Sequence, residues 1–235
     1  MALKAVIFSG LLYLSIVYSL WFMVALWAFA LYFYFRSFFN IHQYLASFLI
    51  LLVASLLVAN LSSVVGRWSL VVGLFLALLF FLLLGIKNLI FIRREPLYYL
   101  LNSLLFLTVF IYFFSSNNFD QPFWFLIKSL AIFSATFFLF KEFLTVSVPV
   151  PLGSQKMNLM AVGSAFLSLQ FLWVIAFLPF RSLNTASLAL LVALILEDFI
   201  VHHLSGTINR RIVLRNITMF LILAMIIFGA SKWAP

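Results

Sequence analysis

The sequence contains no cysteine and few charged residues, and both absences narrow what the protein can be. Without a thiol, the chain can form no disulfide bond, no thiolate metal site and no cysteine nucleophile. Only 8% of its 235 residues are Asp, Glu, Lys or Arg, whereas a soluble domain carries about 25%. So little polar surface cannot be solvated well by water, and lipid is the solvent that suits it.

The residues that are abundant are apolar and aromatic. Hydrophobic side chains make up 67% of the chain, with 31 Phe, 8 Tyr and 6 Trp, which excludes an intrinsically disordered protein. The formal net charge is +9, a value that also suits nucleic-acid binding. That binding needs a basic face on a soluble domain, and no such domain is present, so we expect no nucleic-acid partner. Cations in short cytoplasmic loops explain the charge.

Long uninterrupted apolar runs, such as LILLVASLLVA, indicate helices rather than the alternating strands of a barrel. About 20 apolar residues rising 1.5 Å each cross the roughly 30 Å of hydrocarbon in a bilayer. We therefore predict an all-α fold, a polytopic transmembrane helix bundle of about eight spans that forms one integral membrane domain over residues 1–235. The predicted spans are residues 8–35, 44–65, 69–91, 97–115, 122–146, 157–178, 184–204 and 212–232.

The first of these spans is unusually long. The stretch from Ala5 to Phe35 contains 31 residues and is about 46 Å long as a helix. Two spans joined by a turn need more residues than this, so we expect one long, tilted helix. The total then lies between seven and nine spans.

Loop cations predict the orientation, because cytoplasmic loops carry an excess of Lys and Arg. One side of the expected bundle holds Arg36, Arg93, Arg94, Lys141, Lys156, Arg210, Arg211 and Arg215, with Lys87 close by, and the other holds Lys4, Arg67, Arg181 and Lys232. The first group is therefore expected in the cytoplasm and both ends of the chain outside. We expect the membrane to be a bacterial or archaeal cytoplasmic membrane.

One short segment concentrates the groups that could carry chemistry. Glu197, Asp198, His202 and His203 fall within seven consecutive residues near the end of a predicted span. Asp198 and His202 are four residues apart and share one helix face, whereas Glu197 points about 100° away from Asp198. The pair could relay a proton or cation, bind a divalent metal ion, or form structural ion pairs with nearby arginines. A metal site needs a third ligand from another span, so we expect none.

Other polar residues within or beside the spans are weaker candidates. Lys128 lies near the predicted outer surface, where its ammonium group can extend to the headgroups. Gln170 lies near the middle of span 157–178, and an interhelical hydrogen bond explains it. Basic residues at the expected cytoplasmic side could contact anionic lipid headgroups; these are Arg93, Arg94, Arg210, Arg211 and Arg215.

No recognisable catalytic motif appears, which leans against an enzyme and implies no cofactor. The leading hypothesis is an accessory, scaffold or interaction subunit whose partners are membrane lipids, other membrane proteins or a second copy of the chain. One alternative is a small transporter or channel with an intramembrane Asp198–His202 relay. A further alternative is an intramembrane enzyme, acting on a lipid or dependent on a metal, with one more acid, His or Lys from another helix.

Overall fold

The computed structural model describes residues 2–17, 20–36, 44–60, 69–88, 94–115, 122–147, 153–178 and 180–230. In these ranges the protein is 93% helical and forms nine α-helices, which confirms the expected all-α class for the described residues. The contacts divide the chain into two compact units, residues 1–105 and 106–235. The prediction of a single domain over 1–235 stays a prediction.

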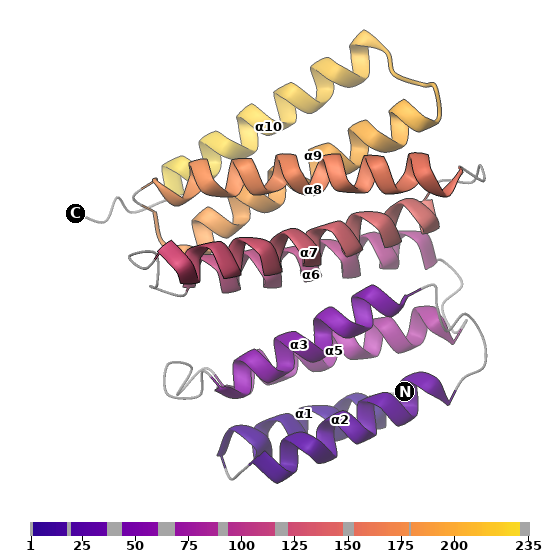
Figure 1. Cartoon of the computed structure of the whole chain (residues 1–235), viewed down its shortest axis with the longest axis vertical. Coiled ribbons are helices and arrows are strands. Elements are labelled where there is room, and N and C mark those ends of the chain that lie inside the picture. The colour runs from indigo at the N-terminus through magenta and orange to yellow at the C-terminus, as the bar shows by residue number, and fades with distance from the viewer. Residues whose placement is uncertain are drawn as a thin grey trace. The chain divides into compact units, whose positions relative to one another are not determined.

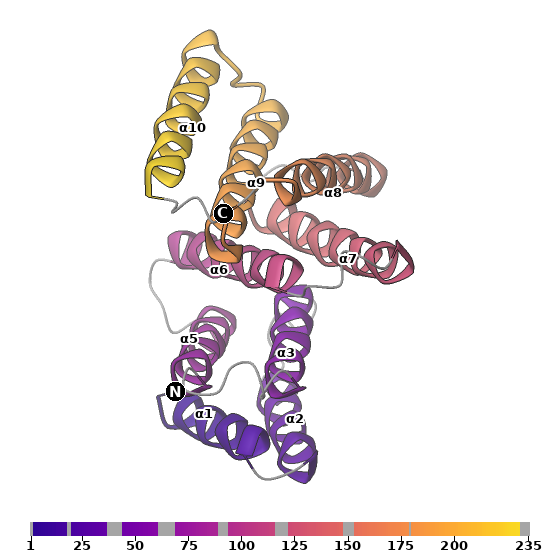
Figure 2. The same ribbon diagram turned by 90° about the vertical axis from the view of Figure 1, so that its left-hand side faces the viewer.

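The first unit is built from four helices and the beginning of a fifth. These are α1 (Ala2–Val17), α2 (Leu20–Phe35), α3 (Leu45–Asn60), α5 (Ser69–Lys87) and the first half of α6 (Arg94–Ser115). Helix α1 packs against α2, α3 and α5, as Figure 2 shows. Phe8 stacks on Phe80 with ring centroids 4.5 Å apart, and Tyr34 stacks on Phe48 at 3.9 Å. All four rings are fully buried, so aromatic packing holds this unit together.

The structure differs from expectation in the first apolar stretch. Where one helix over 8–35 was predicted, α1 and α2 are separate helices of 16 residues that pack against each other. The Nζ atom of Lys4, near the start of α1, lies 4.3 Å from the centroid of the Phe33 ring near the end of α2. Because both helices are apolar on every face, no periodicity in the sequence marks the break between them.

The second unit contains the remaining half of α6 and four further helices. These are α7 (Pro122–Ser147), α8 (Ser154–Ala176), α9 (Ser182–Leu204) and α10 (Arg210–Ala230). Each packs against the next along the chain, α7 on α8, α8 on α9 and α9 on α10 (Figure 1). Ala161 and Ala165 are fully buried on α8, and such small side chains allow helices to approach closely. Antiparallel neighbours therefore bring the end of α9 beside the start of α10.

Five of the described helices, α6 to α10, are long and apolar enough to cross a membrane. Helices α1, α2, α3 and α5 are equally apolar but have only 16 to 19 residues. The helices thus fit a membrane protein, while these lengths do not confirm the predicted number of about eight spans.

Candidate functional site

The acidic and histidine-bearing segment lies at the end of α9, where the chain turns into α10. The turn has the hydrogen bonds of a Schellman motif. The Thr207 N–H donates to the His202 carbonyl at 3.0 Å, and the Gly206 N–H donates to the His203 carbonyl at 3.2 Å. Gly206 has a φ of 64°, a left-handed conformation that glycine adopts without steric cost. This turn positions Asp198 and His202 opposite the first turns of α10.

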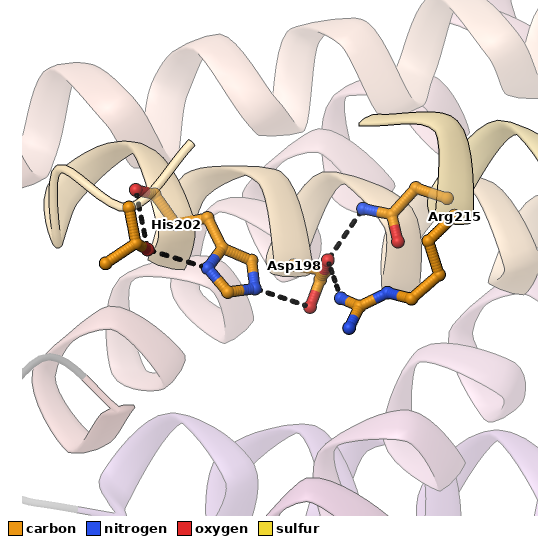
Figure 3. Close-up of polar contacts among 5 residues, drawn as sticks. Asp198, His202 and Arg215 are labelled. Atoms are coloured by element: carbon orange, nitrogen blue, oxygen red, sulfur yellow. Dashed lines mark hydrogen bonds and ion pairs between the residues drawn. The ribbon is translucent and has the colours of Figure 1, made fainter. Parts of the chain in front are cut away.

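Asp198 is the centre of the site, and it contacts side chains of both helices (Figure 3). Its Oδ2 accepts hydrogen bonds from Arg215 Nη2 at 3.1 Å and from Asn216 Nδ2 at 2.6 Å. Its Oδ1 lies 3.6 Å from His202 Nε2 on the same helix. We call Asp198, His202, Arg215 and Asn216 the Asp198 cluster. Both carboxylate oxygens are engaged, so the cluster fastens α9 to α10.

His202 continues the chain of contacts toward the turn. Its Nδ1 lies 2.8 Å from the Thr207 hydroxyl, which is also 3.4 Å from the His202 carbonyl oxygen. When the imidazole is neutral with its proton on Nε2, the hydroxyl donates to Nδ1. When the imidazole is protonated, Nδ1–H donates to the hydroxyl, which then donates to the carbonyl. Protonation of His202 therefore reverses the hydrogen bond to Thr207 without moving heavy atoms.

The other two residues of the predicted set do not join this cluster. Glu197 is 4% exposed and points into the packed side of α9, whereas His203 is exposed to solvent. The expectation that the four side chains do not converge on one ligand stays a prediction. Among the residues that the structure describes, no group of three or more His, Cys, Asp or Glu side chains is arranged to hold a metal ion.

Lys128 and Gln170 occupy different environments. Lys128 lies in the second turn of α7, where it is half-buried. Gln170 lies on α8 with its side chain exposed, and it has no hydrogen-bond partner among the described residues. The interhelical hydrogen bond expected for Gln170 is therefore absent within the described part of the chain.

The basic residues assigned to lipid headgroups also separate into groups. Arg215 is bound to Asp198, and its side chain is 53% exposed. Arg210 and Arg211 are exposed in the first turn of α10, and neither forms an ion pair with a described residue. Arg94 is exposed at the start of α6, and Arg93 lies outside the described residues.

Sequence reasoning missed Asn216 and Thr207, which complete the contacts of the Asp198 cluster. Asn216 was visible as a polar residue seven positions into α10, and its side chain is 5% exposed. Its partner could not be deduced because the register between α9 and α10 depends on the intervening turn. A buried Asn early in an otherwise apolar helix is the signal that could have found it.

A second polar contact, also missed, lies in the first unit. Lys87, the last residue of α5, is fully buried and donates a hydrogen bond to the backbone carbonyl of Tyr34 in α2. Its Nζ lies 3.6 Å from the centroid of the Tyr34 ring, a cation–π contact. The sequence places Lys87 within the predicted span 69–91, close to its cytoplasmic end, and gives no sign of a side-chain or backbone partner.

Chemically, the Asp198 cluster can hold two helices together, and through His202 it can bind or release one proton. Asp198, His202 and the Thr207 hydroxyl follow one another in the order carboxylate, imidazole, hydroxyl, as in a nucleophilic triad, but the 3.6 Å between Asp198 Oδ1 and His202 Nε2 is longer than a hydrogen bond. Neither a known protein family, nor a curated protein, nor a solved structure matches the chain.

Proposed function

We propose that the chain is a multi-pass integral membrane protein that acts as an accessory, scaffold or interaction subunit in a bacterial or archaeal cytoplasmic membrane. One observation carries this proposal: the acidic group best placed for chemistry, Asp198, is tied to side chains of its own two helices. The carboxylate of Asp198 accepts hydrogen bonds from Arg215 and Asn216 through Oδ2, and Arg215 balances its charge. Such an arrangement stabilises a helix pair and leaves little for a substrate to bind.

The exposed side chains support the same role. On α10, Asn216 and Ala224 are the buried residues of the described part, and long apolar side chains cover the rest of the helix. Exposed apolar surface of this extent is typical of a face that meets lipid or another protein. Lipids and membrane proteins, including a second copy, are therefore the proposed partners.

Charge distribution supports a specific topology. Because Lys4 contacts Phe33, the start of α1 lies beside the end of α2 and so on the side of Arg36. If every helix crosses the membrane, this side also holds the first turns of α6, α8 and α10, which carry Arg94, Lys156 and Arg210. With nine crossings, Lys4 therefore lies on the side of the membrane that carries most of the cations. The positive-inside rule assigns this side to the cytoplasm. We propose this topology in place of one with both ends outside.

Extraction from membranes tests the integral character directly. Membranes that contain the protein are washed at alkaline pH with sodium carbonate, which removes peripheral proteins but not spanning helices. We expect the protein to stay in the membrane pellet and to leave it only when detergent is added. Release by carbonate alone would refute the proposal.

Arg210 and Arg211 are proposed to bind anionic lipid headgroups at this cytoplasmic surface. The neighbouring carboxylate of Asp198 is already engaged by Arg215, so it does not neutralise them. Each arginine near an anionic surface contributes about 1 kcal/mol of attraction. The double variant Arg210→Gln/Arg211→Gln should lower the enrichment of phosphatidylglycerol over phosphatidylcholine around the purified protein, and an unchanged enrichment would reject this role.

A proton relay is the second candidate, favoured by the continuous contacts from Asp198 through His202 to the exposed Thr207. Protein reconstituted in liposomes should conduct protons if this candidate is correct, and Asp198→Asn should abolish the conductance. Our leading proposal expects no proton flux above that of empty vesicles. The two functions are therefore separated by one flux measurement.

A further inference from the structure

Helix α8 carries a regular stripe of side chains on the face opposite its buried residues. Four of its members are exposed by 42% to 88%, and Gly163 and Gln170 are exposed too. The stripe, here called the α8 stripe, consists of Leu159, Gly163, Phe166, Gln170, Trp173 and Phe177. Steps of four and three residues alternate along it, giving a mean period of about 3.6, which keeps all six residues on one face of the helix.

The buried face of α8 is already occupied within the unit. Ala161, Ser164, Ala165 and Ser168 are all buried where α8 packs against α7 and α9. At about 100° per residue, these positions lie on the opposite side of the helix from the α8 stripe. Of the stripe, Trp173 also reaches the packed side, where its Nε1 donates a hydrogen bond to Ser129 Oγ of α7 at 3.1 Å and its ring lies 5.8 Å from that of Phe125. The rest of the stripe forms a surface on the side of α8 away from its buried residues.

Gln170 distinguishes this surface from one that faces lipid alone. It lies close to midway between Lys156 and Arg181, the charged residues on either side of α8, and thus at the depth of the hydrocarbon. Its amide has no hydrogen-bond partner among the described residues. Lipid tails solvate Phe166 and Leu159 well, but they offer an amide neither donor nor acceptor. The position fits a partner that can hydrogen-bond at this depth.

We propose that a second copy of this chain covers the α8 stripe, with the two α8 helices parallel and the Gln170 side chains hydrogen-bonded to each other. An amide both donates and accepts, so two copies satisfy one another. Two chains inserted in the same orientation place Gln170 at equal depth, and a two-fold axis along the membrane normal then brings like residues together. This inference rests on the proposed function, because it requires α8 to cross a membrane.

Glycine and aromatic residues make the stripe suitable for this contact. A Cβ built on Gly163 meets no atom within 4 Å, so there is open space beside the backbone at that point. Small residues at a helix interface let two backbones approach closely and strengthen interhelical hydrogen bonds. Phe166 and the exposed part of Trp173, whose indole N–H is bound to Ser129, lie on either side of Gln170 and would exclude water and lipid from the amide pair.

Disulfide crosslinking tests the geometry of the proposed dimer. Because the chain contains no cysteine, only the introduced cysteine of each variant can form a crosslink between copies. Single variants Gly163→Cys, Phe166→Cys and Phe177→Cys are oxidised in native membranes. Phe171→Cys serves as the control, since Phe171 is exposed to a similar extent as Trp173 but lies off the stripe. We expect covalent dimers from the three stripe positions and monomers from Phe171→Cys. Absent dimers, or equal crosslinking at Phe171→Cys, would overturn the proposal.

Energy transfer between labelled copies in proteoliposomes tests the role of Gln170. Gln170→Leu should weaken dimerisation by about three- to thirtyfold, the range expected for one interhelical hydrogen bond in a membrane. Gln170→Asn should retain part of the affinity. The matched control is Gln155→Leu, an exposed glutamine on the same face but in the first turn of the helix, where water can hydrogen-bond its amide, so dimerisation should change little. Equal effects of Gln170→Leu and Gln155→Leu would contradict the inference.

These outcomes separate the inference from the proposed function. If carbonate releases the protein from membranes, the proposed function itself fails. If the protein stays in the membrane but crosslinks nowhere along the α8 stripe, only the dimer is refuted and lipid is the occupant of that face. Variants are compared only where gel filtration in detergent gives the same single peak as the parent protein, so a misfolded variant is not counted.

Discussion

The polar contacts of Lys87 and of Asp198 each join two helices of this protein, and they do so in different ways. In the first unit, the buried ammonium of Lys87 meets a backbone carbonyl and the ring of Tyr34. In the second unit, Asp198 is 38% exposed and meets the side chains of Arg215 and Asn216. A buried charge cannot exchange its partners for water, whereas an exposed one can. Lys87 should therefore matter more for stability than the better-equipped Asp198 cluster.

Truncation of Lys87 should give the largest effect. Lys87→Ala removes the cation–π contact and leaves the Tyr34 carbonyl without its donor, so we expect a loss of about 3 kcal/mol in the free energy of unfolding. Lys87→Met keeps most of the side-chain volume and removes the desolvated charge, so it should cost clearly less. Unfolding in mixed detergent micelles measures both. Equal losses would show that packing, rather than the ammonium, is what matters at this position.

Neutralising Asp198 should have a smaller effect. Asp198→Asn weakens the hydrogen bonds from Arg215 and Asn216 and should lower the free energy of unfolding by about 1.5 kcal/mol. Combined with Arg215→Gln in a double-mutant cycle, it should give a coupling energy of about 0.5–1 kcal/mol, as for other partly exposed ion pairs. A loss larger than that of Lys87→Ala would reverse the comparison between the two contacts.

The turn that positions the Asp198 cluster can be tested separately. Gly206→Ala places a Cβ on a residue with positive φ and should cost about 1 kcal/mol, even though no atom lies within 4 Å of that Cβ. Gly10→Ala, in the middle of α1 and equally open, is the matched control and should not destabilise the protein. Similar costs at both glycines would argue against strain at the turn.

The smallest effect is expected at Thr207. Thr207→Val keeps the shape of the side chain but removes the hydroxyl next to His202, so stability should fall by about 0.5 kcal/mol. The same detergent unfolding assay measures this loss. A loss as large as that of Asp198→Asn would make the His202–Thr207 contact a main part of the cluster, which the account does not expect.

Much of the fold could be predicted because apolar runs and prolines are local signals. Helix α9 begins at Ser182 and ends at Leu204, where a span over 184–204 was expected, and α7 begins at Pro122 as its proline suggested. The division of the first apolar stretch could not be predicted. Because α1 and α2 are apolar on all faces, no change in the hydrophobic pattern marks where one helix ends and the next begins. Only the packing of α1 on α2 reveals it.

For the candidate site, the sequence predicted which residues were unusual but not what they contact. The four-residue spacing placed Asp198 and His202 on one face of a helix, which the 3.6 Å contact confirms. The spacing could not show which cation pairs with Asp198, and the structure shows that it is Arg215, in the second turn of α10. Which residues of α9 and α10 lie opposite each other depends on the length of the turn between them and on the left-handed conformation of Gly206. The spacing of residues within one helix does not reveal this alignment.

Cysteine labelling with a membrane-impermeant maleimide tests the central claim, a membrane-embedded bundle with the start of α1 and the α9–α10 turn on one side. Single variants Leu3→Cys, Ser205→Cys and Arg181→Cys are compared in intact and in permeabilised cells. The account predicts that Arg181→Cys reacts in intact cells, whereas Leu3→Cys and Ser205→Cys react only after permeabilisation. Labelling of Leu3→Cys in intact cells would contradict the topology, and labelling of all three regardless of permeabilisation would contradict membrane insertion.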